Sequence, residues 1–176
     1  GLQFNLKSVL GYPEKQATLA TGGNVGGTFD MPKAGAKVSV VNAVHGSELV
    51  PPMVQPSGPG QPAALASGNP VGYVIQIAGG PTIYHTGDTD VFTDMKLIAD
   101  FFKVDVMLSA IGGHFTMDPA RAAQAVEWVQ PKQVIPMHFG TVPILAGTPA
   151  LFKAALDKRG LGGRMGEMKP GEERSF

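Results

Sequence analysis

The sequence of 176 residues contains no cysteine, which excludes disulfide bonds and thiolate metal sites. Any metal ion in this protein must therefore be held by histidine and carboxylate side chains. The sequence also lacks a run of eighteen apolar residues, so it predicts no membrane-spanning helix. Neither sign of charge predominates, because fourteen Lys and Arg residues balance fourteen Asp and Glu residues, and the longest basic cluster is Lys158-Arg159. This pattern argues against a nucleic-acid-binding surface.

Glycine and proline are abundant, with 24 and 15 residues, and they predict many turns rather than a helical bundle. Hydrophobic residues make up 43% of the chain, which is enough for a buried core. The chain opens Gly1-Leu2-Gln3, without an initiator methionine or a targeting segment. We therefore expect it to begin after a cut or an omitted segment. The sequence does not assign a compartment, and a cytoplasmic location is the default expectation.

The first half of the chain has the character of β-strands. Residues 37–44 include four valines and predict a buried strand that ends at His45. Residues 71–77 carry apolar side chains at every second position, from Val71 to Ile77, which predicts a half-buried strand with that face inward. A turn at residues 78–81 joins it to a short strand at residues 82–84.

Residues 51–70 separate these strands and consist largely of Pro, Gly, Ser, Ala and Gln without periodicity. Loops of this length inside a domain are often lids or binding loops, so we expect a flexible flap beside His45. Disorder is the alternative interpretation of the same composition. The 176 residues are expected to form a single domain or the C-terminal part of one.

The second half alternates strands and helices. Helices are predicted at residues 94–102, 118–130 and 149–159, short strands at residues 105–109 and 133–137, and a last strand and turn at residues 166–172. Asp118 is a good N-cap and Pro119 a good first helical residue. The buried stripe of that helix is expected to comprise Ala122, Ala125, Val126 and Val129.

The most informative loop is residues 84–90, Tyr-His-Thr-Gly-Asp-Thr-Asp, which follows the strand at residues 82–84. Gly87 permits a tight turn beside Asp88, and the hydroxyls of Thr86 and Thr89 are placed to orient that carboxylate. A simple Asx-type turn is the alternative interpretation, because Gly-Asp-Thr is common in turns.

Three residues that favour metal binding occupy equivalent places, since His45, Asp88 and His138 each follow a predicted strand. Strands of one sheet that end on a shared edge bring such residues together. Imidazoles and a carboxylate suit Zn, Fe, Mn or Ni. Each histidine alone is equally consistent with an ordinary surface or core residue. His85, one residue inside its strand, is expected to orient a ligand.

Four motifs carry a family resemblance. They are VNAVHGS at residues 41–47, IYHTGDTDVF at residues 83–92, IGGHFTM at residues 111–117 and IPMHFGT at residues 135–141. In this order they resemble the later half of a metallo-β-lactamase-fold hydrolase, and they are most similar to the metal-dependent hydrolases of the UPF0173 type. The resemblance extends from about Gly22 to Glu172.

The resemblance implies an α/β fold, the αββα sandwich, with two divalent metal ions at one edge, zinc first and Mn, Fe or Ni as alternatives. By position, His45 completes the first metal site, Asp88 bridges both ions, and His138 is the last ligand of the second. A hydroxide between the ions attacks an ester, lactone, amide or phosphoester. His114 contacts the substrate or donates a proton to the leaving group, and a purely structural His114 is the alternative.

One family motif, His-x-His-x-Asp-His, is absent from these 176 residues. In the family it supplies most ligands of both ions, so we expect this chain to be the C-terminal part of a longer protein that binds metal weakly alone. The expected partner is an N-terminal segment of the same fold, a second chain, or a second copy of this chain. An exposed hydrophobic edge would attract such a partner.

Two functions remain open. The first is a metal-dependent hydrolase of a small-molecule substrate, completed by the missing piece. The second is a non-catalytic half-domain that binds a partner or ligand. The fold does not select the substrate, because unrelated chemistries share this type of site.

Overall fold

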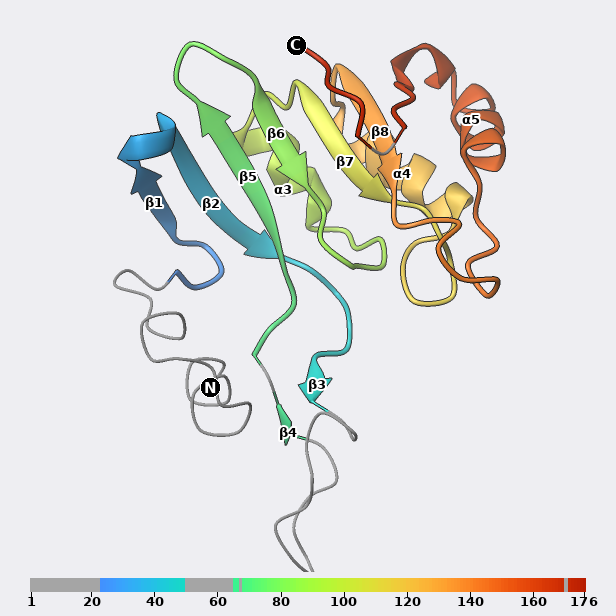
Figure 1. Ribbon diagram of the computed structural model, residues 1–176, viewed down its shortest axis with the longest axis horizontal. Coiled ribbons are helices and arrows are strands. Elements are labelled where there is room, and N and C mark those ends of the chain that lie inside the picture. The colour runs from blue at the N-terminus through green and yellow to red at the C-terminus, as the bar shows by residue number, and fades with distance from the viewer. Residues whose placement is uncertain (1–22, 50–64, 67, 170) are drawn as a thin grey trace, which may run out of the picture.

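The computed structural model describes residues 23–49, 65–66, 68–169 and 171–176 of the chain (Figure 1). Its centre is a six-stranded sheet in the order β1-β2-β5-β6-β7-β8. The strands are β1 (Thr28–Met31), β2 (Ala36–Asn42), β5 (Val71–Ile77), β6 (Thr82–His85), β7 (Val106–Ala110) and β8 (Gln133–Met137). A separate two-stranded ribbon pairs β3 (Glu48–Leu49) with β4 (Leu65–Ala66). The helices are α3 (Met95–Phe101), α4 (Pro119–Val129) and α5 (Pro149–Asp157), with short 3-10 turns η2 (Pro32–Ala34) and η3 (Gly162–Arg164).

The sheet changes character at β6. Strands β1, β2, β5 and β6 pair antiparallel, whereas β6, β7 and β8 pair parallel. The antiparallel pair β5 and β6 is joined by the predicted short turn, where Gly79 has a φ of 69°. Each parallel step needs a crossover, and α3 and α4 supply the two crossovers. Both helices lie behind the sheet in Figure 1.

The helix boundaries follow their predicted signals. The Asp118 side chain accepts a hydrogen bond from the amide of Arg121 at 2.8 Å, and Pro119 is the first residue of α4. Thr148 caps α5 in the same way through the amide of Leu151. The predicted stripe of α4 is buried as expected.

The core lies between one face of the sheet and the three helices. Val74, Tyr84 and Met107 belong to this core, and each is fully buried. Because side chains alternate along a strand, the apolar residues predicted as the inner face of β5 point the other way. That prediction was wrong: Tyr73 and Ile77 are exposed, and Val74 faces the helices.

Two other expectations need correction. The strand predicted at residues 37–44 ends at Asn42, and Val44 is 47% exposed because the chain has already left the sheet. In the described part of residues 166–172 no strand forms. An isolated bridge pairs Met165, just before this segment, with Val134, and Gly171 has a φ of 83°, a turn conformation.

Most of the predicted flap at residues 51–70 lies outside the described residues. No helix in the described part of the chain is long and apolar enough to cross a membrane.

Candidate functional site

The predicted site residues follow strands that end on the same edge of the sheet. β2 is antiparallel to β5 and β5 to β6, so β2 runs in the same direction as β6, β7 and β8. The four arrowheads therefore point to one edge in Figure 1. The loops after these strands carry His45, Asp88, His114 and His138.

Asp88 and His138 approach each other at this edge. The distance between His138 Nε2 and Asp88 Oδ2 is 3.5 Å, and both side chains are partly exposed, at 30% and 50% respectively. His138 Nδ1 is buried and has no hydrogen-bond partner among the described residues. His138 adopts a φ of 56°, a conformation that is unfavourable for a residue with a Cβ atom. The fold thus holds this imidazole in a strained backbone position facing a carboxylate.

Gly87 allows the loop that presents Asp88 to pack closely against β5. Its φ is 67°, and a Cβ atom at this position would lie 2.3 Å from the carbonyl oxygen of Val71. The backbone of the loop can therefore lie directly on β5 only because residue 87 has no side chain.

His85 supports the same loop. The amide of Gly87 donates a hydrogen bond to His85 Nδ1 at 3.0 Å, so the proton of the neutral ring is on Nε2. Burial lowers the pKa of His85, and the nearby charge of Asp88 opposes this change. The lowered pKa favours the neutral ring that accepts this bond. His85 thus orients the backbone beside Asp88.

The two threonine hydroxyls do not hold Asp88, contrary to expectation. Thr86 donates to the carbonyl of Gly87 at 2.8 Å, and Thr89 donates to the carbonyl of Asp90 at 2.7 Å. A threonine hydroxyl readily bonds a backbone carbonyl close to it in the sequence. Both hydroxyls do so here and are therefore not available to the Asp88 carboxylate.

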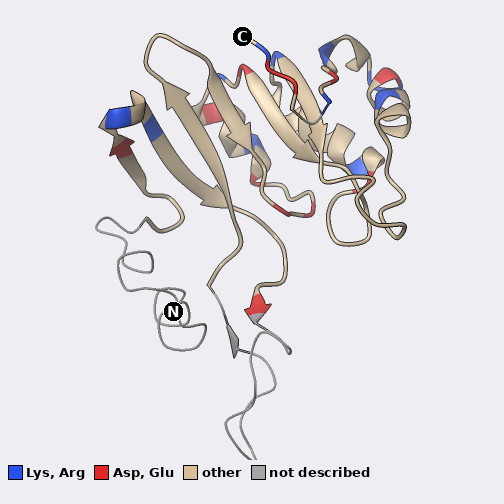
Figure 2. Cartoon of the chain, viewed as in Figure 1, with Lys and Arg blue, Asp and Glu red and all other residues tan. Residues whose placement is uncertain are grey.

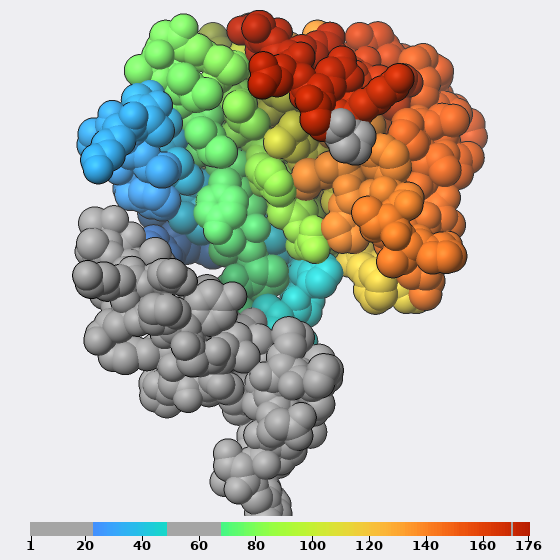
Figure 3. Space-filling model, in the orientation of Figure 1, coloured from blue at the N-terminus to red at the C-terminus, as the bar shows by residue number. Residues whose placement is uncertain are grey.

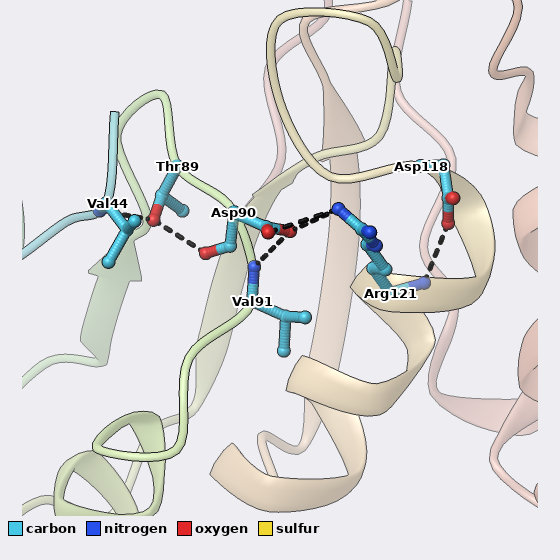
Figure 4. A network of polar contacts seen from close by, with 6 residues as sticks. All are labelled: Val44, Thr89, Asp90, Val91, Asp118 and Arg121. Carbon is cyan, nitrogen blue, oxygen red and sulfur yellow. Dashed lines mark hydrogen bonds and ion pairs between the residues drawn. The ribbon is translucent and has the colours of Figure 1, made fainter. Parts of the chain in front are cut away.

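Thr89 instead connects three segments, and Figure 4 shows its contact with one of them, at Val44. Its hydroxyl accepts a hydrogen bond from the amide of Val44 at 2.9 Å, and its carbonyl accepts one from Met117 at 3.0 Å. The amide of Asp90 donates to the carbonyl of Val44 at 2.9 Å. Thr89 is fully buried. The loops that follow β2, β6 and β7 are therefore joined through this one residue.

His45 lies apart from the Asp88–His138 pair. Its ring is exposed, and Nδ1 lies 2.6 Å from the carbonyl oxygen of Gly46, its own neighbour. In the part of the chain that the structure describes, no three His, Asp or Glu side chains form a group that could hold a metal ion. The ligand role of His45 stays a prediction.

Sequence reasoning missed Arg121. This residue lies in the first turn of α4 and reaches across to Asp90, with Nη1 at 3.0 Å and 3.1 Å from the two carboxylate oxygens (Figure 4). The two residues are 31 positions apart, so no local pattern could pair them. The helical phase of Arg121, outside the buried stripe, indicated only an exposed side chain.

The donor chemistry at the edge fits a divalent metal ion in part. An imidazole nitrogen that faces a carboxylate oxygen can supply two ligands to one ion, although His138 Nδ1 lacks, among the described residues, the partner that a metal-bound imidazole usually has. A stable site needs three or four donors, and the described residues bring two together.

Comparison with known proteins places these features in context. The family described as "Beta-lactamase superfamily domain" matches residues 12–138. A UPF0173 metal-dependent hydrolase from Anaeromyxobacter dehalogenans is 54% identical over 87% of this chain and 54% of its own length. Another from Thermodesulfovibrio yellowstonii is 46% identical over 92% of this chain and 58% of its own length. The chain thus spans a little over half the length of these curated relatives.

Among solved structures, Igni18, described as a novel metallo hydrolase from the archaeon Ignicoccus hospitalis, superposes with a TM-score of 0.70 at 31% identity. The match covers 89% of this chain and 60% of that protein.

Proposed function

This chain belongs to the β-lactamase superfamily, and from that premise we propose that it forms part of the active site of a metal-dependent hydrolase. The family match and the solved neighbours confirm the predicted metallo-β-lactamase-type α/β fold. The observation that carries the proposal is the approach of His138 Nε2 to Asp88 Oδ2 at the sheet edge. The names of the relatives support the same chemistry.

Asp88 and His138 would hold the metal, with Asp88 able to bridge two ions and His45 as a further ligand. Zinc is the first choice, because imidazole and carboxylate are among its usual ligands. When bound, a divalent ion supplies Lewis-acid polarisation of the scissile bond and a more acidic water. The substrate classes that this chemistry serves are esters, lactones, amides and phosphoesters.

The chain's own residues would position this chemistry. His85 fixes the backbone of Gly87, which sets the direction of Asp88. Thr89 ties the loop of Asp88 to the loops that carry His45 and His114. His114 is exposed at this edge, where it would contact the substrate or donate a proton to the leaving group.

The remaining metal ligands would come from a segment outside this chain. Two donors meet among the described residues, and the curated relatives are nearly twice as long as the matched region. We propose that an N-terminal segment of the same fold, or a second chain, supplies these ligands. A second copy of this chain is a further possible partner.

A non-catalytic binding module is the second candidate function. One observation favours it: the exposed ring of His45 is directed to Gly46 rather than to Asp88 and His138. In such a module the residues at the edge would contact a partner or a ligand without turnover.

Metal analysis of the purified protein tests the proposal. Intact mass spectrometry of the same sample identifies any second polypeptide. We expect divalent metal in the wild type, and Asp88→Ala should lose both bound metal and hydrolysis of a panel of chromogenic esters and phosphoesters. Asp100→Ala is the matched control, because Asp100 is an exposed carboxylate on α3 with no hydrogen bond to a described residue.

Metal content and turnover that are the same in wild type and Asp88→Ala would contradict the metal assignment. A metal-free protein without hydrolase activity, also when a polypeptide carrying His-x-His-x-Asp-His is supplied, would favour the binding module.

A further inference from the structure

A hollow of about 360 Å³ is lined in part by His45, one of the three proposed metal ligands. Its lining includes His45, Asp90, His114, Phe115, Thr116 and Arg121. Its volume is at the small end of the range for small-molecule sites. The loops that line it follow β2, β6 and β7, so it opens at the same edge of the sheet as the loops that carry Asp88 and His138.

Arg121 is held in this hollow by two contacts. Asp118 caps the helix at the amide of Arg121, and Asp90 binds the guanidinium. Both oxygens of Asp90 contact the same nitrogen, Nη1. This leaves Nε and Nη2 without a hydrogen bond to any described residue, while the side chain is 57% exposed. The edge formed by Nε and Nη2 is one of the two edges with which arginine binds a carboxylate through two parallel hydrogen bonds.

The hollow suits an anionic group that carries one negative charge, rather than a group that concentrates two charges, such as a phosphate dianion. Arg121 is the single Lys or Arg among its described lining residues, and Asp90 already balances that charge. A phosphate dianion would need more positive charge than one guanidinium that is already paired. A carboxylate needs a single planar donor edge, which Arg121 provides.

The lining also has an aromatic part, formed by His114 and Phe115. The ring of Phe115 is 54% exposed and lies edge-on to His114, with 4.5 Å between the ring centroids. The loop that carries both residues is fixed by hydrogen bonds from Gly113 to Met117 and from Met117 to Thr89. An exposed aromatic ring on a hydrogen-bonded loop can pack against the carbon skeleton of a ligand.

We propose that this hollow recognises a carboxylate group of a small substrate through Arg121, with Phe115 packing against the adjoining carbon chain. The proposed hydrolase would then act preferentially on substrates that carry a carboxylate close to the scissile bond, such as monoesters or monoamides of dicarboxylic acids. This preference rests on the proposed function, whereas binding of the carboxylate does not require metal or turnover.

A binding experiment therefore tests recognition of the carboxylate separately from the proposed hydrolase activity. Glutarate is titrated into the full chain while backbone amide resonances of residues 113–117 are followed by NMR, and glutaramide serves as the neutral probe of the same shape. We expect saturable shifts with glutarate, and binding of glutaramide that is weaker by about tenfold or more. Arg121→Gln should weaken glutarate binding by a similar factor.

Two further variants test whether the loss of glutarate binding comes from the direct contact with Arg121. Arg159→Gln removes another arginine that is paired with a carboxylate, Glu127 on α4, away from the hollow, and it should leave glutarate binding unchanged. The double variant Asp90→Asn/Arg121→Gln removes the carboxylate that Arg121→Gln would leave unpaired. It should remain as weak as Arg121→Gln, because the direct contact is missing in both.

Equal binding of glutarate and glutaramide would overturn the proposal, and so would recovery of glutarate binding in the double variant. Tighter binding of inorganic phosphate than of glutarate would overturn the choice of a carboxylate. If the protein hydrolyses neutral esters while glutarate does not bind, the proposed function stands and the carboxylate preference fails.

Discussion

Gly87 shows how one residue determines the position of Asp88. Two separate constraints act there, a φ of 67° and the close approach of the Val71 carbonyl. Gly79, in the turn between β5 and β6, shares the first constraint but not the second. Its φ is 69°, and no heavy atom lies within 4 Å of the place where a Cβ atom would be. A comparison of Gly87 with Gly79 therefore separates the energetic cost of backbone strain from the cost of steric overlap.

We predict that Gly87→Ala destabilises the protein by about 3 kcal/mol, the sum of left-handed strain and forced displacement of β5. Gly79→Ala should cost about 1 kcal/mol, because only the strain applies. Urea unfolding of both variants measures the two free energies. Equal losses in the two variants would mean that the loop moves away from Val71 without cost, and that Asp88 is not fixed by this contact.

At the scale of the elements, Asp105 joins the starting ends of three strands. Its carboxylate accepts a hydrogen bond at 2.8 Å from the amide of Thr82, the first residue of β6, and contacts Nζ of Lys132, just before β8, at 2.6 Å. Its own backbone donates to Thr82 and accepts from Gln133. The hydrogen bond from Lys132, and then that from Thr82, lowers the pKa of Asp105.

The lowered pKa of Asp105 predicts how the contribution of this residue to protein stability depends on pH. The ionised carboxylate is favoured in the folded state, so its contribution to stability is complete above the unfolded-state pKa of about 4. The contribution is lost as the pH falls through the lower folded-state pKa. Asp105→Asn should therefore be less stable than wild type at about pH 6, and the difference should shrink at about pH 3. Urea unfolding at both values measures it. Asp100→Asn is the control, and a difference for Asp105→Asn that does not change with pH would contradict the role of the charge.

Local signals in the sequence were sufficient for most elements. The alternation in β5, the N-cap of α4 and the short turn after Ile77 are each encoded by neighbouring residues. The inward face of β5 was not encoded locally, because both faces of this strand carry apolar residues and only the helices decide which is covered. The same limit applies to the site. The strand-end positions of Asp88 and His138 were readable, whereas the bond of Arg121 to Asp90 and the direction of His45 depend on the tertiary structure.

For the molecule as a whole, the helices cover one face of the sheet in the described residues. Charged residues occur mainly on helices and loops, and β5 to β8 carry almost none (Figure 2). The face away from the helices is the one towards the reader in Figure 3. Tyr73 and Ile77 lie on this face and are 39% and 37% exposed. An apolar sheet face of this kind favours association.

We predict that the purified chain self-associates with rising concentration through this face, and that Tyr73→Lys together with Ile77→Lys weakens the association. The charged side chains should remain in water, so the melting temperature should change little. Sedimentation velocity over a range of concentrations measures the effect. Leu151→Lys is the control, because Leu151 is 54% exposed on α5. Association that Leu151→Lys weakens as strongly as the double variant would assign the contact to another surface.

Three residues other than glycine have a positive φ in the described chain: His114, Gln130 and His138. Two of them are the histidines proposed for substrate contact and metal binding. A glycine at either position would relieve roughly 1 kcal/mol of backbone strain and remove the imidazole at the same time. Selection for stability and selection for chemistry therefore act in opposite directions at these two positions, so a library screened only for heat resistance should enrich glycine where the imidazoles now stand.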